Sequence, residues 1–400
     1  MRIGINCSRL APEYRGGVNS FAFGLLDAFA ESKRGHNFVI FSSPRNRGMF
    51  QRFERLEKFK IIEIDGPLTR IGRGLFNRIP ASLRFRLLYR QYNHFLNRSD
   101  AERIARAVDV QYVPYCPMPI FPFPEIPTIY SIHDLQHVHY PQFFTASERL
   151  VRDIAFANTV AHAALIQAST QHMAGEFAAN FSNLPLHKII VIPEGVDIAA
   201  FGKTPERDVR SHYGLPERFL FYPAQLWPHK NHIIIFKALA QLKSSGIDIP
   251  LVLTGARYSG SDDLLPYLEA AAANNIHYLG VVPYPDIIAL HRAARFLVTA
   301  SLYESSSIPI LEACAAGTPI IASAASAHVE QEKVLQMQLF PPCNPEALAD
   351  ILRNTWNDDA LIARHVAHNS EAIKAFTWNK AAEGYLDALE SAHRQPAGKP

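Results

Sequence analysis

The chain has 400 residues, of which 48% are hydrophobic and 19% are charged, so it is long enough for two hydrophobic cores and is not a disordered polypeptide. Its formal net charge of +3 is too small to indicate a nucleic-acid-binding protein. The four cysteines are scattered and form no Cys-x-x-Cys pair, so neither a disulfide framework nor a cysteine zinc site is indicated.

Short runs rich in Val, Ile and Leu alternate with amphipathic stretches along the whole chain. One series of runs lies near residues 2, 37, 60, 110, 127, 165 and 188, and a second lies near 219, 249, 276, 296, 319 and 338. Such alternation predicts parallel sheets with helices on both faces. We expect an α/β protein of two Rossmann-like domains facing a central cleft, with its ligands beyond the carboxyl ends of the strands.

A glycine pair, Gly16-Gly17, follows the first predicted strand where a helix begins. Glycine allows the backbone to approach a ligand closely. The pair is not a Gly-x-Gly-x-x-Gly fingerprint, so dinucleotide binding is not indicated. A flexible loop without a ligand is the alternative.

A basic stretch follows, because no acidic residue stands between Asp65 and Asp100 while the arginines from Arg70 to Arg98 alternate with leucines and aromatic residues. This mixture is typical of an amphipathic helix on an anionic membrane, and also of an arginine-rich solvated face on a core helix. The sequence shows neither a charged leader nor an uncharged apolar stretch of about 18 residues. We expect a cytoplasmic protein, or one held peripherally at the inner face of a membrane.

His133 and Asp134 stand at the end of the strand predicted near 127, where a catalytic or sugar-orienting pair would be placed. A metal site formed by His133, His137 and His139 lacks the His-Glu-x-x-His pattern and a nearby cysteine set. Further along, Pro193 and Gly195 end a strand and start a connector. We therefore expect domains at residues 1–195 and 196–375, followed by a closing helix and tail at 376–400.

Two loops of the second domain carry charged side chains at places where a ligand could bind. Lys230 stands just before a helix, where its ammonium could meet a diphosphate or merely be exposed. In the stretch ESSSIPILEACAAGTP, the serines at 305–307 are expected to cap a short helix that has Pro309 in its first turn and ends at Gly317.

The amino end of that short helix would seat a phosphate. Glu304 and Glu312 flank the position, and each carboxylate could accept hydrogen bonds from sugar hydroxyls. The alternative is a capped surface helix with two incidental glutamates.

Together these loops resemble the retaining GT-B glycosyltransferases of the glycosyl transferases group 1 family, also called family 4. The matching pieces occur in the family's order: Gly16-Gly17, His133-Asp134, IPEGVD at 192–197, Lys230-Asn231, and Glu304 with Glu312 as Glu-x7-Glu. The stretch PAQLWPHKNH at 223–232 resembles bacterial polysaccharide and O-antigen transferases of the mannosyltransferase type.

The resemblance implies an acceptor-binding first domain and a donor-binding second domain. It implies that Glu304 faces the donor sugar with His133 and Asp134 beside it, and that Glu312 meets the ribose. The diphosphate would be held by Lys230, the amides of Ser306, Ser307 and Ile308, and the loop of Gly16 and Gly17. Two positions depart from the family, since Gln225 stands where an arginine is usual and serines 305–307 replace Gly-Phe-Gly.

The expected activity is therefore transfer of a sugar from GDP-mannose or a UDP-sugar to a glycan or lipid-linked saccharide, with retention, in synthesis of cell-surface polysaccharide or lipopolysaccharide. The chain contains no Asp-x-Asp, so we expect neither a metal nor another cofactor. A nucleotide-sugar epimerase and a non-catalytic partner subunit of the same fold are the alternatives.

Overall fold

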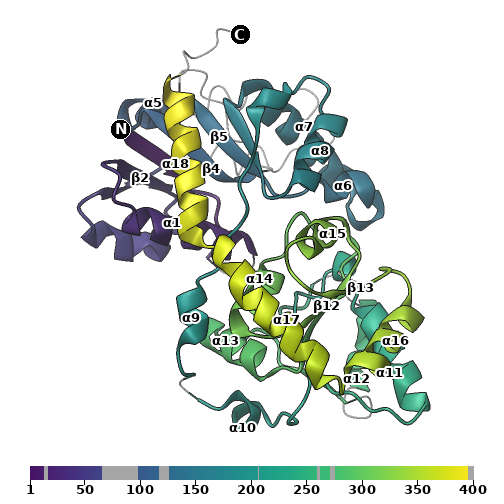
Figure 1. Cartoon of the computed structure of the whole chain (residues 1–400). Helices are drawn as coiled ribbons and strands as arrows, with labels where there is room; N and C mark the ends of the chain where they lie inside the picture. Colours follow the sequence, from purple (N-terminus) through teal and green to yellow (C-terminus); the bar gives the residue numbers. More distant parts are fainter. Residues whose placement is uncertain are drawn as a thin grey trace. The chain divides into compact units, whose positions relative to one another are not determined.

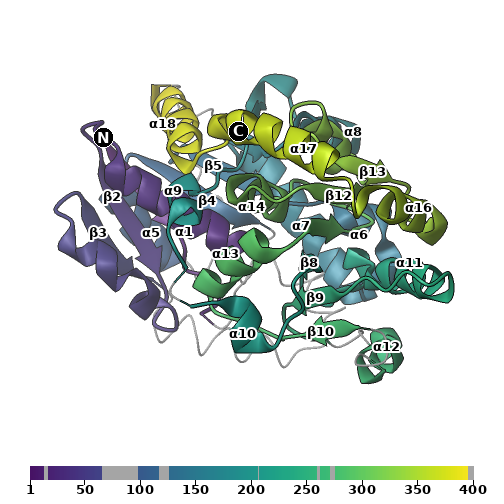
Figure 2. The ribbon, with the colours of Figure 1, turned by 60° about the horizontal axis from the view of Figure 1, so that its bottom comes forward.

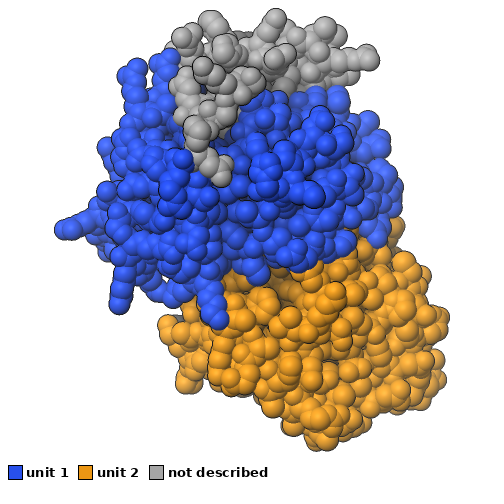
Figure 3. Space-filling model, turned by 45° about the horizontal axis from the view of Figure 1, so that its top comes forward, with its two compact units in different colours: residues 1–193, 378–400 blue, residues 194–377 orange. Residues whose placement is uncertain are grey.

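The computed structural model describes residues 1–12, 17–64, 98–116, 126–205, 207–258, 262–270 and 275–394. Gly16 and the predicted basic stretch up to residue 97 lie outside them. The chain divides into two compact units, residues 1–193 with 378–400 (unit 1) and residues 194–377 (unit 2), which Figure 3 distinguishes by colour. The sequence places the corresponding boundaries after residues 195 and 375.

Unit 1 is built on a parallel sheet of seven strands in the order β3-β2-β1-β4-β5-β6-β7. The strands are β1 (Arg2–Asn6), β2 (Asn37–Ser42), β3 (Phe59–Glu63), β4 (Val110–Cys116), β5 (Thr128–Ile132), β6 (Leu165–Ala168) and β7 (Ile189–Val191). Its described α-helices are α1 (Gly17–Glu31), α5 (Arg98–Ala107), α6 (Gln136–His139), α7 (Ala146–His162), α8 (Gln171–Asn180) and α18 (Trp378–Arg394). Short 3-10 helices occupy Arg47–Arg55, Pro141–Phe143 and Leu186–Lys188.

The C-terminal helix α18 belongs to unit 1 and packs against α1 (Figure 1). Close approach of the two helices depends on Gly24, because a Cβ added there would lie 2.2 Å from the ring of Trp378. Further along α18, the ring of Tyr385 lies 4.7 Å from that of Tyr112 on β4. The last helix of the chain therefore completes the core of the first unit.

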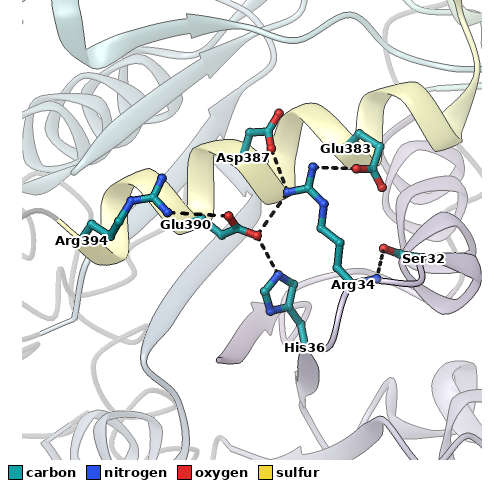
Figure 4. Close-up of polar contacts among 7 residues, drawn as sticks. All are labelled: Ser32, Arg34, His36, Glu383, Asp387, Glu390 and Arg394. Carbon is teal, nitrogen blue, oxygen red and sulfur yellow. Dashed lines mark hydrogen bonds and ion pairs between the residues drawn. The ribbon is translucent and has the colours of Figure 1, made fainter.

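Charged groups reinforce this packing at the surface (Figure 4). The Arg34 guanidinium lies 2.7 Å from both Glu383 and Asp387 and 3.1 Å from Glu390, all on α18. His36 Nε2 lies 3.0 Å from the Glu390 carboxylate. One loop of unit 1 thus holds successive turns of α18.

Unit 2 has a parallel sheet of six strands in the order β10-β9-β8-β11-β12-β13. The strands are β8 (Leu220–Pro223), β9 (Leu251–Thr254), β10 (Ile276–Tyr278), β11 (Phe296–Thr299), β12 (Ile320–Ser323) and β13 (Gln338–Phe340). In this order β8 and β11 are neighbours, and the chain continues from them in opposite directions across the sheet. The ends of these two strands therefore form a topological switch point, where ligands bind in open α/β sheets.

Helices surround the second sheet as well, and Figure 2 shows α11 and α16 side by side. The described α-helices are α9 (Ile198–Gly202), α10 (Val209–Tyr213), α11 (His232–Ser244), α12 (Leu265–Glu269), α13 (Tyr284–Ala293), α14 (Ile308–Ala316), α15 (Ser326–Glu332), α16 (Pro345–Thr355) and α17 (Asp359–Ala372). The short 3-10 helices are η5 (Pro228–Lys230), η6 (Asp262–Leu264) and η7 (Ile373–Ala375).

Each apolar run predicted as a strand forms one, and the predicted α/β class with two parallel sheets is confirmed. The central strands could be found because they are buried on both faces and are therefore almost continuously apolar. The edge strands β3, β7, β10 and β13 are only partly buried but still follow apolar runs. Within the described residues, no helix combines the length and apolar character needed to cross a membrane.

Candidate functional site

An ion pair joins two loops at the switch point of unit 2. Lys230 ends η5, which follows β8, and its Nζ donates a hydrogen bond to Oε1 of Glu304, which follows β11. The same oxygen accepts from Ser301 Oγ at 2.6 Å. The backbones of the two loops are also joined, since Leu302 N donates to His229 O at 2.8 Å. Two charges predicted to serve one ligand therefore lie in contact.

Buried hydroxyl groups hold this ion pair in place. Tyr222 OH donates to Lys230 O at 2.8 Å and lies 3.3 Å from Ser301 Oγ. Tyr222 is 2% exposed and Ser301 is fully buried. Hydrogen bonds that are shielded from water fix geometry more strongly than exposed ones. Sequence reasoning missed both residues, because a Tyr within a strand and a Ser after one are ordinary.

The charge of Glu304 is stabilised in this setting. Burial alone would raise the pKa of Glu304, but the Lys230 ammonium, helped by His328 and His229, lowers that pKa below its ordinary value. Glu304 is therefore an anion at neutral pH and is not suited to donate a proton as a general acid.

His328 is a further buried residue beside the pair that sequence reasoning missed. Its Nδ1–H donates to Ser323 O at 2.8 Å, and Ser323 Oγ donates to Ser301 O at 2.6 Å. Burial lowers the pKa of His328, although the charge of Glu304 opposes the shift. Its Nε2 has no hydrogen-bond partner among the residues that the structure describes. A histidine one turn into a helix looks like any core residue in the sequence.

Helix α14 begins beside Glu304 and differs in one respect from the prediction. Ser307 is the residue before the helix, but its side chain makes no capping bond, so the expected serine cap is wrong. Pro309 lies in the first turn, and Gly317 ends the helix with φ 73°, as predicted. Ser307 is 4% exposed, and Ser306 and Ile308 are half-buried. Without a side-chain cap, the amino end of α14 keeps donors for another acceptor.

Glu312 lies within α14 in surroundings unlike those of Glu304. It is 6% exposed, and its Oε1 accepts from Tyr284 OH at 2.9 Å. Its other oxygen lies 3.5 Å from Nε2 of the fully buried His291. Burial and the Glu312 carboxylate raise the pKa of Tyr284, which keeps its hydroxyl a donor. The two glutamates therefore have separate sets of partners.

Gln225 accepts a hydrogen bond from the indole N–H of Trp227. The Trp227 ring stacks on that of Tyr258, with 3.7 Å between centroids. The amide is thus oriented by an aromatic pair.

In unit 1, the structure places Gly17 at the exposed start of α1 and His133 directly after β5. His133 Nε2–H donates to Pro114 O at 2.7 Å, and the ring meets Phe21 edge-on with 4.9 Å between centroids. Burial lowers the pKa of His133, so its ring is neutral at pH 7.

Asp134 is held differently from its neighbour. Its Oδ1 accepts from Arg152 Nη1 and from Gln136 N, both at 3.0 Å, which ties it to α7 and to the start of α6. Among the described residues there is no group of three or more His, Cys, Asp or Glu arranged to hold a metal ion.

Two family models match the chain, "Glycosyltransferase Family 4" over residues 15–200 and "Glycosyl transferases group 1" over residues 206–372. A D-inositol 3-phosphate glycosyltransferase of Salinispora arenicola is 27% identical over 289 residues, which are 67% of this chain and 64% of that protein. The O-antigen chain mannosyltransferase B of Escherichia coli is 23% identical over 265 residues, 65% of this chain and 69% of that protein. The chain thus spans somewhat less than two thirds of the length of the first of these relatives.

A solved structure of similar fold is that of Anabaena HepE in complex with UDP and glucose. It superposes with a TM-score of 0.73 at 18% identity, covering 98% of this chain and 100% of that one. Because the two family models match consecutive parts that make up most of the sequence, the protein belongs to the glycosyl transferases group 1 family, and its fold is GT-B.

Proposed function

We propose that the protein is a glycosyltransferase that moves a sugar from a nucleotide-sugar donor to a saccharide or lipid-linked acceptor, with retention of anomeric configuration. The observation that carries this proposal is the Lys230–Glu304 ion pair at the switch point of unit 2, beside the amino end of α14. Membership of the family and the relatives named as glycosyltransferases support it.

The reaction breaks the bond between the anomeric carbon of the sugar and a phosphate oxygen, and the electron pair stays on the leaving nucleoside diphosphate. Lys230 and the N–H groups at the start of α14, from Ser306 to Ile308, supply positive potential where this charge grows. A lysine ammonium has three donors, so it can hold a carboxylate and a phosphate oxygen together. With this charge and no Asp-x-Asp, the proposal requires no bridging metal.

The acceptor hydroxyl attacks the anomeric carbon from the face that the diphosphate leaves, and its proton passes to the leaving phosphate oxygen. This route retains configuration and needs no protein nucleophile. Glu304, ionised and fixed by Ser301 and Lys230, positions the donor sugar and stabilises the positive charge that develops on it. Glu312 accepts hydrogen bonds from the ribose diol.

The donor we favour is GDP-mannose, with a UDP-sugar as the second choice. The mannosyl donor follows from the O-antigen chain mannosyltransferase B of Escherichia coli, and the UDP-sugar from the HepE complex with UDP and glucose. The acceptor we propose is an intermediate of cell-surface polysaccharide or lipopolysaccharide, met at the cytoplasmic face of a membrane.

Thermal unfolding in a panel of nucleoside diphosphates and their sugars tests the donor. A ligand at about 100 times its Kd stabilises the folded protein by about 2.7 kcal/mol, so one base should raise the Tm clearly above the others. Nucleotide release that depends on an added saccharide would then separate a transferase from an epimerase. If no nucleotide shifts the Tm, the proposal fails.

The role of Lys230 is tested with a matched control. Lys230→Ala should weaken binding of the nucleoside diphosphate, whereas Lys237→Ala, which removes an exposed lysine of α11, should not. Equal affinity in the two variants would remove Lys230 from the diphosphate site.

A further inference from the structure

A charged pocket that is open to solvent lies in unit 2. It has a volume of about 260 Å³ and is lined by Arg210, Glu217, Arg218, Arg292, Ala293, Ala294 and Arg295. Arg218 comes just before β8 and Arg295 just before β11, so the cavity lies at the amino ends of these strands. The ion pair of Lys230 and Glu304 follows the carboxyl ends of the same strands. This arginine pocket and the candidate donor site therefore lie at opposite ends of the same strands.

Three of the four arginines are anchored to backbone carbonyl groups. Arg210 Nη2 donates to Ala293 O at 2.9 Å, Arg292 Nη1 to Phe201 O at 3.1 Å, and Arg295 Nε to Trp356 O at 3.0 Å. Each guanidinium is held before any ligand arrives, which reduces the conformational entropy that binding would cost. Planar guanidinium groups that are already oriented suit the oxygens of a phosphate.

The pocket has more positive than negative charge around it. Four arginines and one carboxylate, Glu217, line it. Beyond the lining, Asp359 pairs with Arg295 and interacts with Arg218, and Asp208 interacts with Arg210. Like charges gathered around one small cavity repel each other, and a bound anion removes that repulsion. Three of the arginines are held by carbonyl groups, whereas Arg218 Nη1 makes a long hydrogen bond of 3.5 Å to Asn357 Oδ1.

One donor of the pocket lacks a partner. Arg210 Nε is buried and has no hydrogen-bond partner among the residues that the structure describes. A buried donor without a partner is rare in folded proteins. Arg210 lines the pocket, but because Nε is shielded from solvent, an anion there would reach it only after the Arg210 side chain turned.

We propose that the arginine pocket binds a small anion that carries a phosphate group, either a free phosphate or a phospholipid headgroup. The cavity is smaller than the roughly 300–1,000 Å³ of typical organic-ligand pockets, which fits a small anion better than a whole nucleotide sugar. The site does not depend on the glycosyltransferase proposal, because the residues of the two sites do not overlap.

Isothermal titration with inorganic phosphate tests the proposal on the full chain. We expect saturable binding that weakens about 10-fold in Arg218→Gln, since one charge-assisted hydrogen bond is lost. Arg218 is exposed and weakly held, so this change should leave the fold intact. Arg353→Gln, which removes the same charge from exposed α16, should bind phosphate as the wild type does.

The comparison is repeated in a Lys230→Ala background to separate the two sites. If Arg218→Gln lowers the phosphate affinity in both backgrounds, the phosphate is assigned to the arginine pocket. Three results would overturn the assignment of phosphate to the arginine pocket. Phosphate affinity could fall through Lys230→Ala alone, or it could be equal in the Arg218 and Arg353 variants. The third result is that neither phosphate nor vesicles bind saturably.

Sedimentation with phosphatidylglycerol and phosphatidylcholine vesicles distinguishes the two sources of phosphate. Arg218-dependent binding to phosphatidylglycerol vesicles identifies a headgroup, whereas Arg218-dependent binding of phosphate without vesicle binding identifies a free ligand. Vesicle binding that is equal in the Arg218 and Arg353 variants contradicts a headgroup at this pocket.

Discussion

The strand ends of the two units carry polar residues at similar places but use them differently. In unit 2, Lys230 and Glu304 come from two loops and contact each other across the switch point. In unit 1, the neighbours His133 and Asp134 point to separate partners, a backbone carbonyl and Arg152. Similar topology therefore supports a concentrated charge pair in one unit and a neutral ring beside an arginine-bound carboxylate in the other.

The largest expected effect comes from neutralising Glu304, and neutralising Asp134 is the comparison. Glu304→Gln should lower kcat by about 10²–10³-fold, as removal of one preorganised electrostatic group does in other enzymes. Asp134→Asn should change kcat by less than about 5-fold, because its amide oxygen can still accept from Gln136 N. Steady-state kinetics with circular dichroism as a folding check measures both. Equal losses of kcat would erase the distinction between the units.

Packing in unit 1 should be next in size. Gly24→Ala places a methyl group against the Trp378 ring and should cost about 1–3 kcal/mol of unfolding free energy. Gly175→Ala, in α8, meets nothing within 4 Å and should be neutral or slightly stabilising. Urea unfolding of both variants compares them. A Gly24→Ala protein as stable as the wild type would show that α1 and α18 can move apart without cost.

Lowering the pH should destabilise unit 2 through His232, which is buried like His291 and His328. Burial, with Lys230 adding to it, lowers the pKa of His232 to about 3, whereas an unfolded histidine has a pKa of about 6.5. Between these values the unfolded chain binds a proton that the native protein does not, so the free energy of unfolding falls as pH is lowered from about 6.5 to 3. His232→Phe should make this decline shallower.

Thermal unfolding between pH 4 and 7 measures this change of slope, with the exposed His162→Phe as the control. Glu304 acts in the same direction, but later in the titration. Its lowered pKa stabilises the native protein above about pH 4.5, and the contribution is lost as pH falls through the native pKa. A slope that is identical in wild type and His232→Phe would contradict the buried neutral ring.

The smallest effect is expected at the charged cluster of Figure 4. Arg34→Ala removes contacts to three partly exposed carboxylates and should cost no more than about 1 kcal/mol, because solvent screens such pairs. The loss should shrink at high salt. Melting curves at two salt concentrations, with Arg394→Ala for comparison, report it. A loss that salt does not change would mean that the Arg34 side chain contributes packing instead of charge.

The sequence predicts the strands well because buried parallel strands consist of consecutive apolar residues, as at β8, β11 and β12. It also predicts the end of α14 at Gly317, since a left-handed residue there favours glycine. It cannot predict which groups bond in three dimensions. Lys230 and Glu304 were expected to reach one ligand, and their contact with each other depends on the pairing of β8 with β11.

The residues that sequence reasoning missed share a physical property. Tyr222, Ser301 and His328 are buried polar groups whose partners are mostly backbone atoms or lie far along the chain. Nothing in their local spacing marks them as different from core residues. The serine cap failed for a related reason, because a sequence shows that a cap is possible but not which way the hydroxyl of Ser307 turns.

Helix α18 has a consequence for how the protein is made. Because residues 378–394 complete the core that begins with α1, the ribosome must synthesise all of unit 2 before unit 1 can close. Until then, the face of α1 that meets Trp378 and Tyr385 has no cover. Domains usually fold as they emerge from the ribosome, and the N-terminal domain folds first. Here the unit that emerges first is the one that must finish last.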